Sequence, residues 1–368
     1  MIFCEEFFKS VHHLFNLTDL FTKIKNSDDL NLSEVVMMKR KICQFDKTKQ
    51  KKSICSLNAG GIKPLAVAIC SVLAGLSSSV YAAAMESPFT ISGPVTLSAG
   101  NNNVKSMSSS TPASLTVTSS GIIKYPDSLS YLYGSKSVAT GSNDGNSITS
   151  SGTINGSTSY SSYLKGGFLN ISGTGYVNVQ ANNNTVSLKA GSSTSNVEVY
   201  GGYVYDTAQD NVTASGNTVF IEYGSEFSGN VNVVGGYASG RGVATASNNK
   251  VILGSGTYTT NILGGHARSY TDQVATVSNN TVYLYGDADV SAAGIVGGDS
   301  NLLVGDPVTG TLTLTGNTLV FGYNNQAWAP SNYTIGNVQN FSTIRFDNAT
   351  WGKTITVNYF VIGKNQVK

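Results

Sequence analysis

A motif of two apolar residues followed by two glycines recurs along most of this 368-residue chain and restricts its possible folds more than any other feature. The clear copies are Val199-Tyr200-Gly201-Gly202, Val233-Val234-Gly235-Gly236, Ile262-Leu263-Gly264-Gly265 and Ile295-Val296-Gly297-Gly298, with an earlier copy at Tyr163-Leu164-Lys165-Gly166-Gly167. Their first glycines are separated by 35, 34, 29 and 33 residues. Such spacing is typical of repeat architectures, in which each unit packs on a near-copy of itself.

A second signal lies between the glycine pairs: an asparagine, then Thr or Lys, then alternating apolar residues. The repeated asparagines are Asn184, Asn217, Asn249, Asn280 and Asn317, and a degenerate copy extends from Gly134 to Ile148. Strand-like segments therefore arrive every 14 to 20 residues. Segments such as Thr218–Glu222 and Thr281–Tyr285 carry the β-branched and aromatic residues that strands prefer. The pattern predicts an all-β fold.

The regular turns favour a solenoid over a sandwich or an up-and-down barrel, because only stacked coils need the same corner at the same interval. We expect a right-handed, single-stranded parallel β-helix, with stacked Asn side chains and with glycines where a corner leaves no room for Cβ. Two rungs of about 17 residues per repeat, at ~4.8 Å each, would make residues 125–361 a rod on the order of 65 Å long. The alternative is a propeller, whose blades of ~40–50 residues are longer than these repeats.

An export signal is predicted before the repeats. The apolar run Pro64–Leu76 has 13 residues, too short to cross a bilayer but suited to a signal peptide. Small residues follow, with cleavage expected after Ala82 or Ala84. The basic residues before and at the start of the run are Lys39, Arg40, Lys41, Lys47, Lys49, Lys51, Lys52 and Lys63.

The expected organisation has five parts. Residues 1–36 are an uncertain extension: either translation starts at Met37 or Met38, or Phe7, Val11 and their neighbours form a real helix. The other parts are an extended, partly helical signal peptide (37–82), a polar β cap (83–124), the repeat solenoid (125–335), and closing strands with a tail (336–368).

Charge and cysteine divide at the same boundary. Charged residues make up 12% of the chain, about half the usual ~25%, and the net charge is only +2. All four cysteines precede residue 83. Without a large positive surplus to neutralise phosphates, nucleic acid is not an expected partner.

The repeated Gly-Gly and Asn-Thr-Val signals, the basic signal segment and the cysteine-free body resemble the passenger domains of autotransporters (type V secretion). Asn340-Phe341-Ser342-Thr343-Ile344-Arg345-Phe346 resembles a segment that often closes such arrays. The resemblance spans about residues 38–361. It implies a chain that the general export machinery and an outer-membrane translocator deliver to the cell surface or the medium.

The resemblance lacks one part, the family's C-terminal β-barrel, for which the sequence after Val361 leaves no room. We therefore expect a truncated or split passenger, or a rod that leaves by another route.

No catalytic residue is predicted. Gly298-Asp299-Ser300 resembles a serine-hydrolase motif, and the order His266, Asp289, Ser300 can be written, but no histidine follows His266. Asp299 occupies the same position after Gly-Gly as Tyr203, Tyr237 and His266, which indicates a repeat variant.

Carboxylate pairs, metals and cofactors give no stronger prediction. The pairs Asp206/Asp210 and Asp287/Asp289 are interpreted as solvated loop residues, and Arg241, Arg268 and Arg345 are scattered. No metal site and no cofactor are expected, since the exported part has one histidine and no cysteine.

Binding remains. Tyrosines recur along the repeats at Tyr203, Tyr205, Tyr223, Tyr237, Tyr258, Tyr270, Tyr283 and Tyr285. Either Tyr203 and Tyr237 belong to an outer stripe that binds a host glycan or protein, or the tyrosines cap the interior at its corners. The sequence predicts a non-enzymatic adhesive or structural protein. The alternatives are a carbohydrate-active β-helix enzyme and a non-functional remnant of a truncated passenger.

Overall fold

The computed structural model describes residues 85–97, 99–105, 112–137, 141–171, 178–208, 210–271, 273–299, 311–348 and 353–361. All belong to the unit Ile69–Lys368. These residues form thirty strands and no helix, so none of their elements could cross a bilayer as a helix. The predicted signal peptide, its cleavage positions Ala82 and Ala84, and the extension 1–36 lie outside the described residues.

The strands form four parallel sheets, which successive turns of the chain visit in a fixed order. Sheet 1 contains β1 (Met85–Glu86), β4 (Gly100–Lys105), β7 (Ser130–Ser137), β10 (Ser162–Ile171), β14 (Glu198–Asp206), β18 (Val233–Gly240), β21 (Asn261–Leu263), β22 (His266–Ser269), β25 (Gly294–Val296), β28 (Thr334–Gln339) and β30 (Thr356–Val361). Sheet 2 contains β2 (Phe89–Ile91), β5 (Ser114–Val117), β8 (Ser147–Ser150), β12 (Thr185–Leu188), β16 (Thr218–Ile221), β20 (Lys250–Leu253), β24 (Thr281–Leu284), β27 (Thr318–Phe321) and β29 (Thr343–Phe346).

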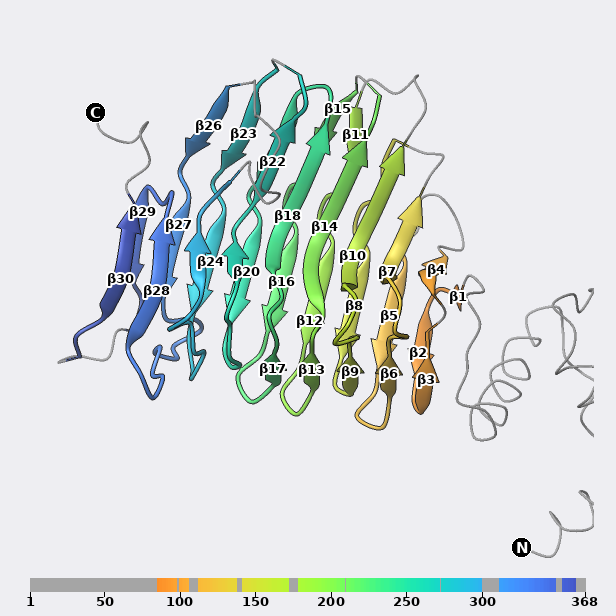
Figure 1. The fold of residues 1–368 in the computed structure, drawn as a ribbon, viewed down its shortest axis with the longest axis horizontal. Coiled ribbons are helices and arrows are strands. Elements are labelled where there is room, and N and C mark those ends of the chain that lie inside the picture. Colours follow the sequence, from red (N-terminus) through yellow and green to blue (C-terminus); the bar gives the residue numbers. More distant parts are fainter. Residues whose placement is uncertain are drawn as a thin grey trace, which may run out of the picture. The chain divides into compact units, whose positions relative to one another are not determined.

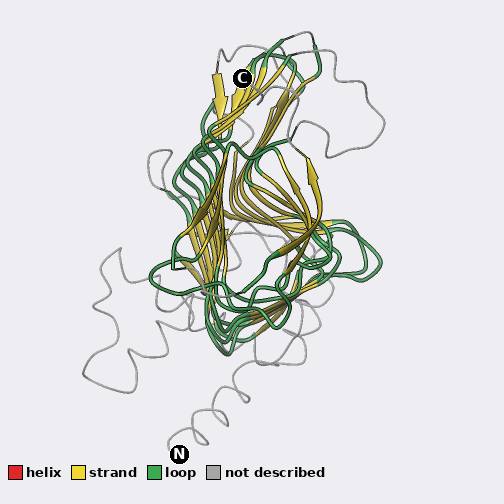
Figure 2. Cartoon of the chain, turned by 90° about the vertical axis from the view of Figure 1, so that its left-hand side faces the viewer, coloured by secondary structure: helices red, strands yellow, loops and turns green. Residues whose placement is uncertain are grey.

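The other two sheets have five strands each. Sheet 3 contains β3 (Pro94–Thr96), β6 (Ile122–Lys124), β9 (Thr153–Asn155), β13 (Ser193–Ser195) and β17 (Glu226–Ser228). Sheet 4 contains β11 (Asn178–Gln180), β15 (Asn211–Thr213), β19 (Ala244–Ser247), β23 (Ala275–Ser278) and β26 (Leu312–Thr315). Figure 1 shows the turns side by side from β1 to β30, and Figure 2 looks along the stack.

This arrangement confirms the predicted all-β parallel solenoid. It excludes the propeller for the described residues, because each sheet is built from equivalent strands of successive repeats. The handedness of the coil stays a prediction. Region 83–124, expected to be a cap, supplies strands to sheets 1, 2 and 3 in the same parallel order.

The prediction of two rungs per repeat is wrong. Val186 pairs with Val219 and Val219 with Val251, so a strand meets its own equivalent one whole repeat away. The glycine-pair segment and the Asn segment lie in different sheets, sheet 1 and sheet 2, and never pair with each other. One repeat is therefore one turn, and the stack is about half as long as predicted, on the order of 33 Å.

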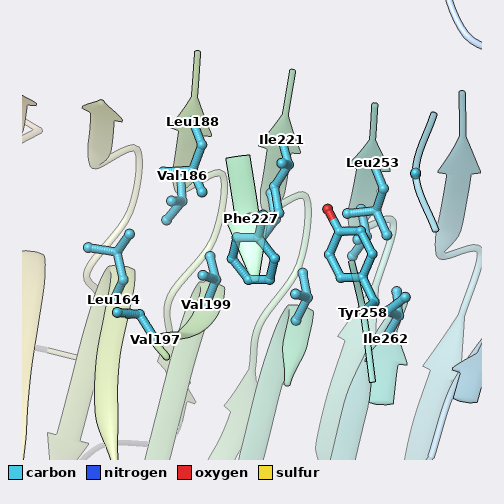
Figure 3. Packing of buried hydrophobic residues seen from close by; sticks show 14 of the residues in the cluster. Leu164, Val186, Leu188, Val197, Val199, Ile221, Phe227, Leu253, Tyr258 and Ile262 are labelled. Carbon is cyan, nitrogen blue, oxygen red and sulfur yellow. The ribbon is translucent and has the colours of Figure 1, made fainter. Parts of the chain in front are cut away.

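Two hydrophobic cores lie inside the coil. Sheets 1, 2 and 3 line the larger core. In it, equivalent residues of successive turns stack on one another, as Val186, Val219 and Val251 do at 0% exposure. Figure 3 shows neighbouring columns, in which Leu188, Ile221 and Leu253 follow one another on successive strands. The smaller core lies between the second halves of β10, β14 and β18 and the strands of sheet 4, around Val204 and Val212. Each fully buried aliphatic side chain contributes about 1.5–3 kcal/mol.

The glycine pairs lie where the long strands of sheet 1 pass from one core to the other. In β14, Val199 points into the larger core and Val204 into the smaller one, five positions later, so the in-out alternation slips by one at Gly201-Gly202. A Cβ on Gly202 would lie 2.5 Å from Oδ1 of Asn217. Each glycine pair thus leaves room for the asparagine that directly precedes a strand of sheet 2. The two repeated sequence signals, Gly-Gly and Asn, are therefore in direct contact.

The buried asparagines form a continuous hydrogen-bonded ladder. Nδ2 of Asn217 donates to Oδ1 of Asn249 (3.1 Å), and Nδ2 of Asn249 donates to Oδ1 of Asn280 (2.9 Å). The backbone N of each donates to the same oxygen, and the second amide hydrogen of Asn249 reaches Ala214 O (3.0 Å). The ladder members are Asn146, Asn184, Asn217, Asn249, Asn280 and Asn317. Their polar groups are paired without water, as buried polar groups require.

Candidate functional site: the outer aromatic cluster

Two rows of large side chains lie in register on the outer side of sheet 1. This is the side opposite to the one on which the glycine pairs contact the asparagine ladder. One row runs Tyr133, Lys165, Tyr200 and the other Phe168, Tyr203, Tyr237, His266. With Tyr131 and Tyr163 beside them, we call these nine residues the outer aromatic cluster.

The rings of the second row stack along the solenoid. Tyr203 and Tyr237 have centroids 4.3 Å apart and planes 7° from parallel, and Tyr237 and His266 are 4.5 Å apart at 11°. Phe168 is tilted by 46° against Tyr203, and it stacks instead on Tyr133 of the first row, at 4.5 Å. In-register parallel strands place like positions one strand spacing apart, which is the distance at which rings stack.

The two rows contact each other across the glycine pair. Tyr200 and Tyr203 lie on either side of Gly201-Gly202, and their ring centroids are 5.3 Å apart, edge to face. Tyr200 and Tyr237 are each only 5% exposed although both point away from the cores. The bend therefore folds the outer face onto itself, and these tyrosines are packing residues.

Lys165 lies in the middle of the cluster. Its Nζ is 3.4 Å from the ring centroid of Tyr203, 4.6 Å from that of Phe168 and 4.9 Å from that of Tyr163. Burial lowers the pKa of Lys165 well below its usual value, and the nearby Glu198 carboxylate opposes that shift. Oε2 of Glu198 accepts a hydrogen bond from the Tyr200 hydroxyl at 2.7 Å. The aromatic faces supply a cation–π attraction where water is excluded.

His266 is buried at the end of the ring stack. Burial, and then the positive charge of Arg268, lower its pKa to about 3, so the ring is neutral at physiological pH. Neither ring nitrogen has a hydrogen-bond partner among the described residues. Among the described residues, no hydrogen bond orients this imidazole as a general base.

The structure describes two of the three hydrolase-like residues, His266 and Asp289, and they lie in different β-bridges. Asp299 pairs with His266 across a β-bridge one turn along, as a repeat variant would. Asp289 instead bridges to Thr257, and its Oδ1 accepts the backbone N–H of Ser291 at 3.0 Å. Ser300 lies outside the described residues.

The half-buried Tyr205 and the exposed Tyr270 form the border of the cluster. Their rings meet edge to face at 6.3 Å, and the Arg268 guanidinium lies 4.6 Å from the Tyr270 centroid. The Ser239 hydroxyl hydrogen-bonds the Tyr270 hydroxyl at 2.9 Å. Tyr270 is 37% exposed, so this border presents aromatic surface to solvent.

The eight recurring tyrosines therefore have several environments. Tyr203, Tyr205, Tyr237 and Tyr270 lie on the outer face of sheet 1. Tyr258 lies in the larger core, and its hydroxyl donates to Ser255 O. The buried Tyr285 hydroxyl accepts the backbone N–H of Tyr223 at 3.0 Å, while Tyr223 itself is exposed and Tyr283 contacts Tyr323. Neither the stripe nor the interior alone accounts for all of them.

The interpretation of Asp206 as a solvated loop residue is wrong. It is fully buried at the end of β14, because that strand continues past the glycine pair into the smaller core. Burial raises its pKa, and the neighbouring Asp210 adds to the shift. Its Oδ1 accepts the N–H of Ala208 at 3.0 Å. Asp287, by contrast, is exposed.

No three His, Cys, Asp or Glu side chains among the described residues lie close enough together to hold a metal ion. Arg241 and Arg345 are exposed and lie in different turns of the coil, whereas Arg268 is buried. These positions supply no basic cluster of the kind that an acidic polysaccharide needs.

Sequence reasoning missed Lys165 and the aromatic residues around it. Aligning the repeats places Lys165 at the position of Tyr200, one residue before the glycine pair, and this alignment is the signal that could have found it. Its contacts with Tyr131 and Tyr133 depend on pairing between β7 and β10, which no local pattern specifies.

No protein-family model, no curated protein and no solved structure matches this chain.

Proposed function

We propose that this protein is an exported, non-enzymatic β-solenoid of the autotransporter-passenger kind that acts at the cell surface or outside the cell, in adhesion. The parallel solenoid of the described residues supports this proposal, since such a rod displays a long repeated surface. The basic and apolar segment before residue 83 supports export.

The observation that carries an adhesive role is the aromatic border formed by the exposed Tyr270 and the half-buried Tyr205. Aromatic rings with a polar hydroxyl stack on the apolar faces of sugar rings and hydrogen-bond their edges. Arg268 and Ser239 are buried and support Tyr270 from behind, since the guanidinium lies 4.6 Å from its ring centroid and the Ser239 hydroxyl hydrogen-bonds its hydroxyl. We therefore propose a glycan as the ligand in preference to a host protein.

Alanine replacements at the border test the adhesive role. The full chain, purified and applied to a panel of immobilised glycans, is expected to bind at least one of them. Tyr205→Ala and Tyr270→Ala should each weaken that binding about tenfold. Tyr223→Ala is the matched control, because Tyr223 is even more exposed than Tyr270 (48% against 37%) but lies outside this border. Binding only to proteins, or equal losses in all three variants, would contradict the glycan proposal.

Export has its own test. The mature protein recovered from the cell surface or the medium should begin directly after Ala82 or Ala84. An intact N-terminus on a cytoplasmic protein would refute export, whereas a start at Met37 or Met38 in the precursor would settle the extension. A barrel encoded directly downstream in the DNA would favour a split passenger over a remnant.

One observation favours the alternative of a carbohydrate-active enzyme. Burial raises the pKa of Asp206, which lies near Asp210, and a raised pKa is what the general acid of a glycosidase requires. Asp206 is fully buried, however, and so does not face a substrate. Release of reducing ends from a polysaccharide, lost in Asp210→Asn, would establish the enzyme instead.

A further inference from the structure

The last described turn of the solenoid exposes side chains whose equivalents in the turns just before it are buried. In sheet 2, Leu319 and Phe321 of β27 are 0% and 4% exposed, whereas their register partners Ile344 and Phe346 of β29 are 40% and 55% exposed. In sheet 1, Val338 of β28 is buried, but its partner Phe360 of β30 is 49% exposed. Figure 1 shows β29 and β30 together at the end of the stack.

The exposed residues occupy core positions. Ile344 continues the column of Val251, Val282 and Leu319, and Phe346 that of Leu253, Leu284 and Phe321. The first turn differs, since Ile91 and Leu97 are already buried there. Within the part of the chain that the structure describes, no strand pairs with the outer edge of β29. A contiguous apolar end with such an edge is a surface that pairs with another strand.

The backbone of β29 is prepared for such pairing. The N–H of Asp347 donates to Phe321 O at 2.8 Å and that of Thr343 to Asn317 O at 3.2 Å, so odd-numbered residues face β27. Because successive residues of a strand face opposite edges, the N–H and C=O of Ile344 and Phe346 point to the free edge.

The charges of β29 make it complementary to itself. Arg345 and Asp347 flank Phe346 on the outer face, and within one chain they form an exposed ion pair at 2.7 Å. In an antiparallel pair centred on Phe346, Phe346 faces its own copy and exchanges both backbone bonds with it. Arg345 then lies opposite Asp347 of the second copy, and Asp347 opposite Arg345, at the closer, non-hydrogen-bonded positions.

We propose that two copies of this chain associate through their last turns, with the β29 strands paired antiparallel about a two-fold axis at Phe346. Such an interface uses the same surface on both copies and therefore closes at two. Head-to-tail stacking would instead need an exposed apolar first turn, whereas the described part of that turn buries Ile91, Val95 and Leu97 and half-buries Phe89.

Charge reversal tests the pairing on the full chain. By sedimentation velocity over about a hundred-fold range of concentration, the native chain should interconvert between one copy and two. In the dimer, residues 345 and 347 of the two copies face each other at two symmetric positions. Arg345→Asp or Asp347→Arg places like charges at both positions, and each variant should raise the dimer dissociation constant about tenfold or more. The double variant Arg345→Asp/Asp347→Arg restores both opposite pairs and should restore the native constant.

Two further variants complete the test. Arg241→Asp makes the same charge change at an exposed residue elsewhere, and it should leave association unchanged. Phe346→Lys should abolish dimers while circular dichroism stays that of a folded β protein, because the side chain is already half exposed. A native chain that stays single, assemblies that grow beyond two copies, or a double variant as weak as the single ones would overturn the proposal.

Discussion

The asparagine ladder and the second row of the outer aromatic cluster run along the solenoid on opposite sides of the glycine pairs. The two tolerate changes of residue from turn to turn differently. The inner ladder repeats one residue, asparagine, from Asn146 to Asn317. The outer row changes from Phe168 to Tyr203, Tyr237, His266 and finally Asp299. Hydrogen bonds in a dry interior fix both donor and acceptor positions, whereas ring stacking accepts any flat side chain. Variation therefore accumulates on the outer side.

Breaking the inner ladder should have the largest effect. Asn249→Leu would leave the N–H and the amide of Asn217, and Ala214 O, without partners in the interior. The free energy of unfolding should fall by about 3–6 kcal/mol, measured by chemical denaturation of the full chain. The adjacent Asn248→Gly is the control and should change it little, since Asn248 has φ 56° and Gly216 and Gly316 hold that position in other turns. Equal effects would contradict the ladder's role.

Filling the space between the asparagine ladder and the outer row should lower the free energy of unfolding by a smaller amount. A Cβ in Gly236→Ala would lie 2.6 Å from both Ala214 O and Oδ1 of Asn249, so backbone and ladder must shift. We expect a loss of about 1–3 kcal/mol in the free energy of unfolding. Gly93→Ala meets nothing within 4 Å and should be nearly neutral, and a similar loss there would show that the close approach is not the cause.

On the outer side, Lys165→Met should stabilise the protein by about 1 kcal/mol at pH 7. The folded pKa of Lys165 lies below its unfolded value of 10.5, so folding at neutral pH requires either a buried charge or the loss of a proton. The stability of the native chain should therefore rise as pH increases toward 10.5, and the advantage of the variant should shrink over the same range. If Lys165→Met is less stable at pH 7, the cation–π attraction outweighs burial.

The smallest effect at pH 7 is expected for His266→Phe, because a neutral ring replaces a neutral ring in the stack. The difference appears in acid. The pKa of His266 is about 3 when folded and 6.5 when unfolded, so the native chain loses stability as pH falls from 6.5 toward 3. Unfolding curves should show that the variant has a higher free energy of unfolding than the native chain at pH 4 but not at pH 7. An equal difference at both values would mean that protonation of His266 is not involved.

How much the sequence could predict depends on the range of the interaction. The glycine and asparagine spacing was sufficient for the solenoid, since both signals recur within each unit. It was not sufficient for the number of rungs, because the segments around Gly201 and Asn217 are equally strand-like and only pairing assigns them to different sheets. The aromatic contacts of Lys165 depend on neighbours a full turn away. The burial of Asp206 depends on a strand that continues past its bend.

The asparagine ladder also gives the rod a direction. From Asn146 to Asn280, each ladder residue donates its backbone N–H and one amide hydrogen to the Asn side-chain oxygen of the next turn. Every turn thus presents an unsatisfied pair of donors until its successor arrives with an acceptor. A chain that emerges from its N-terminal end would be drawn into register one turn at a time, with each completed coil serving as the template for the next.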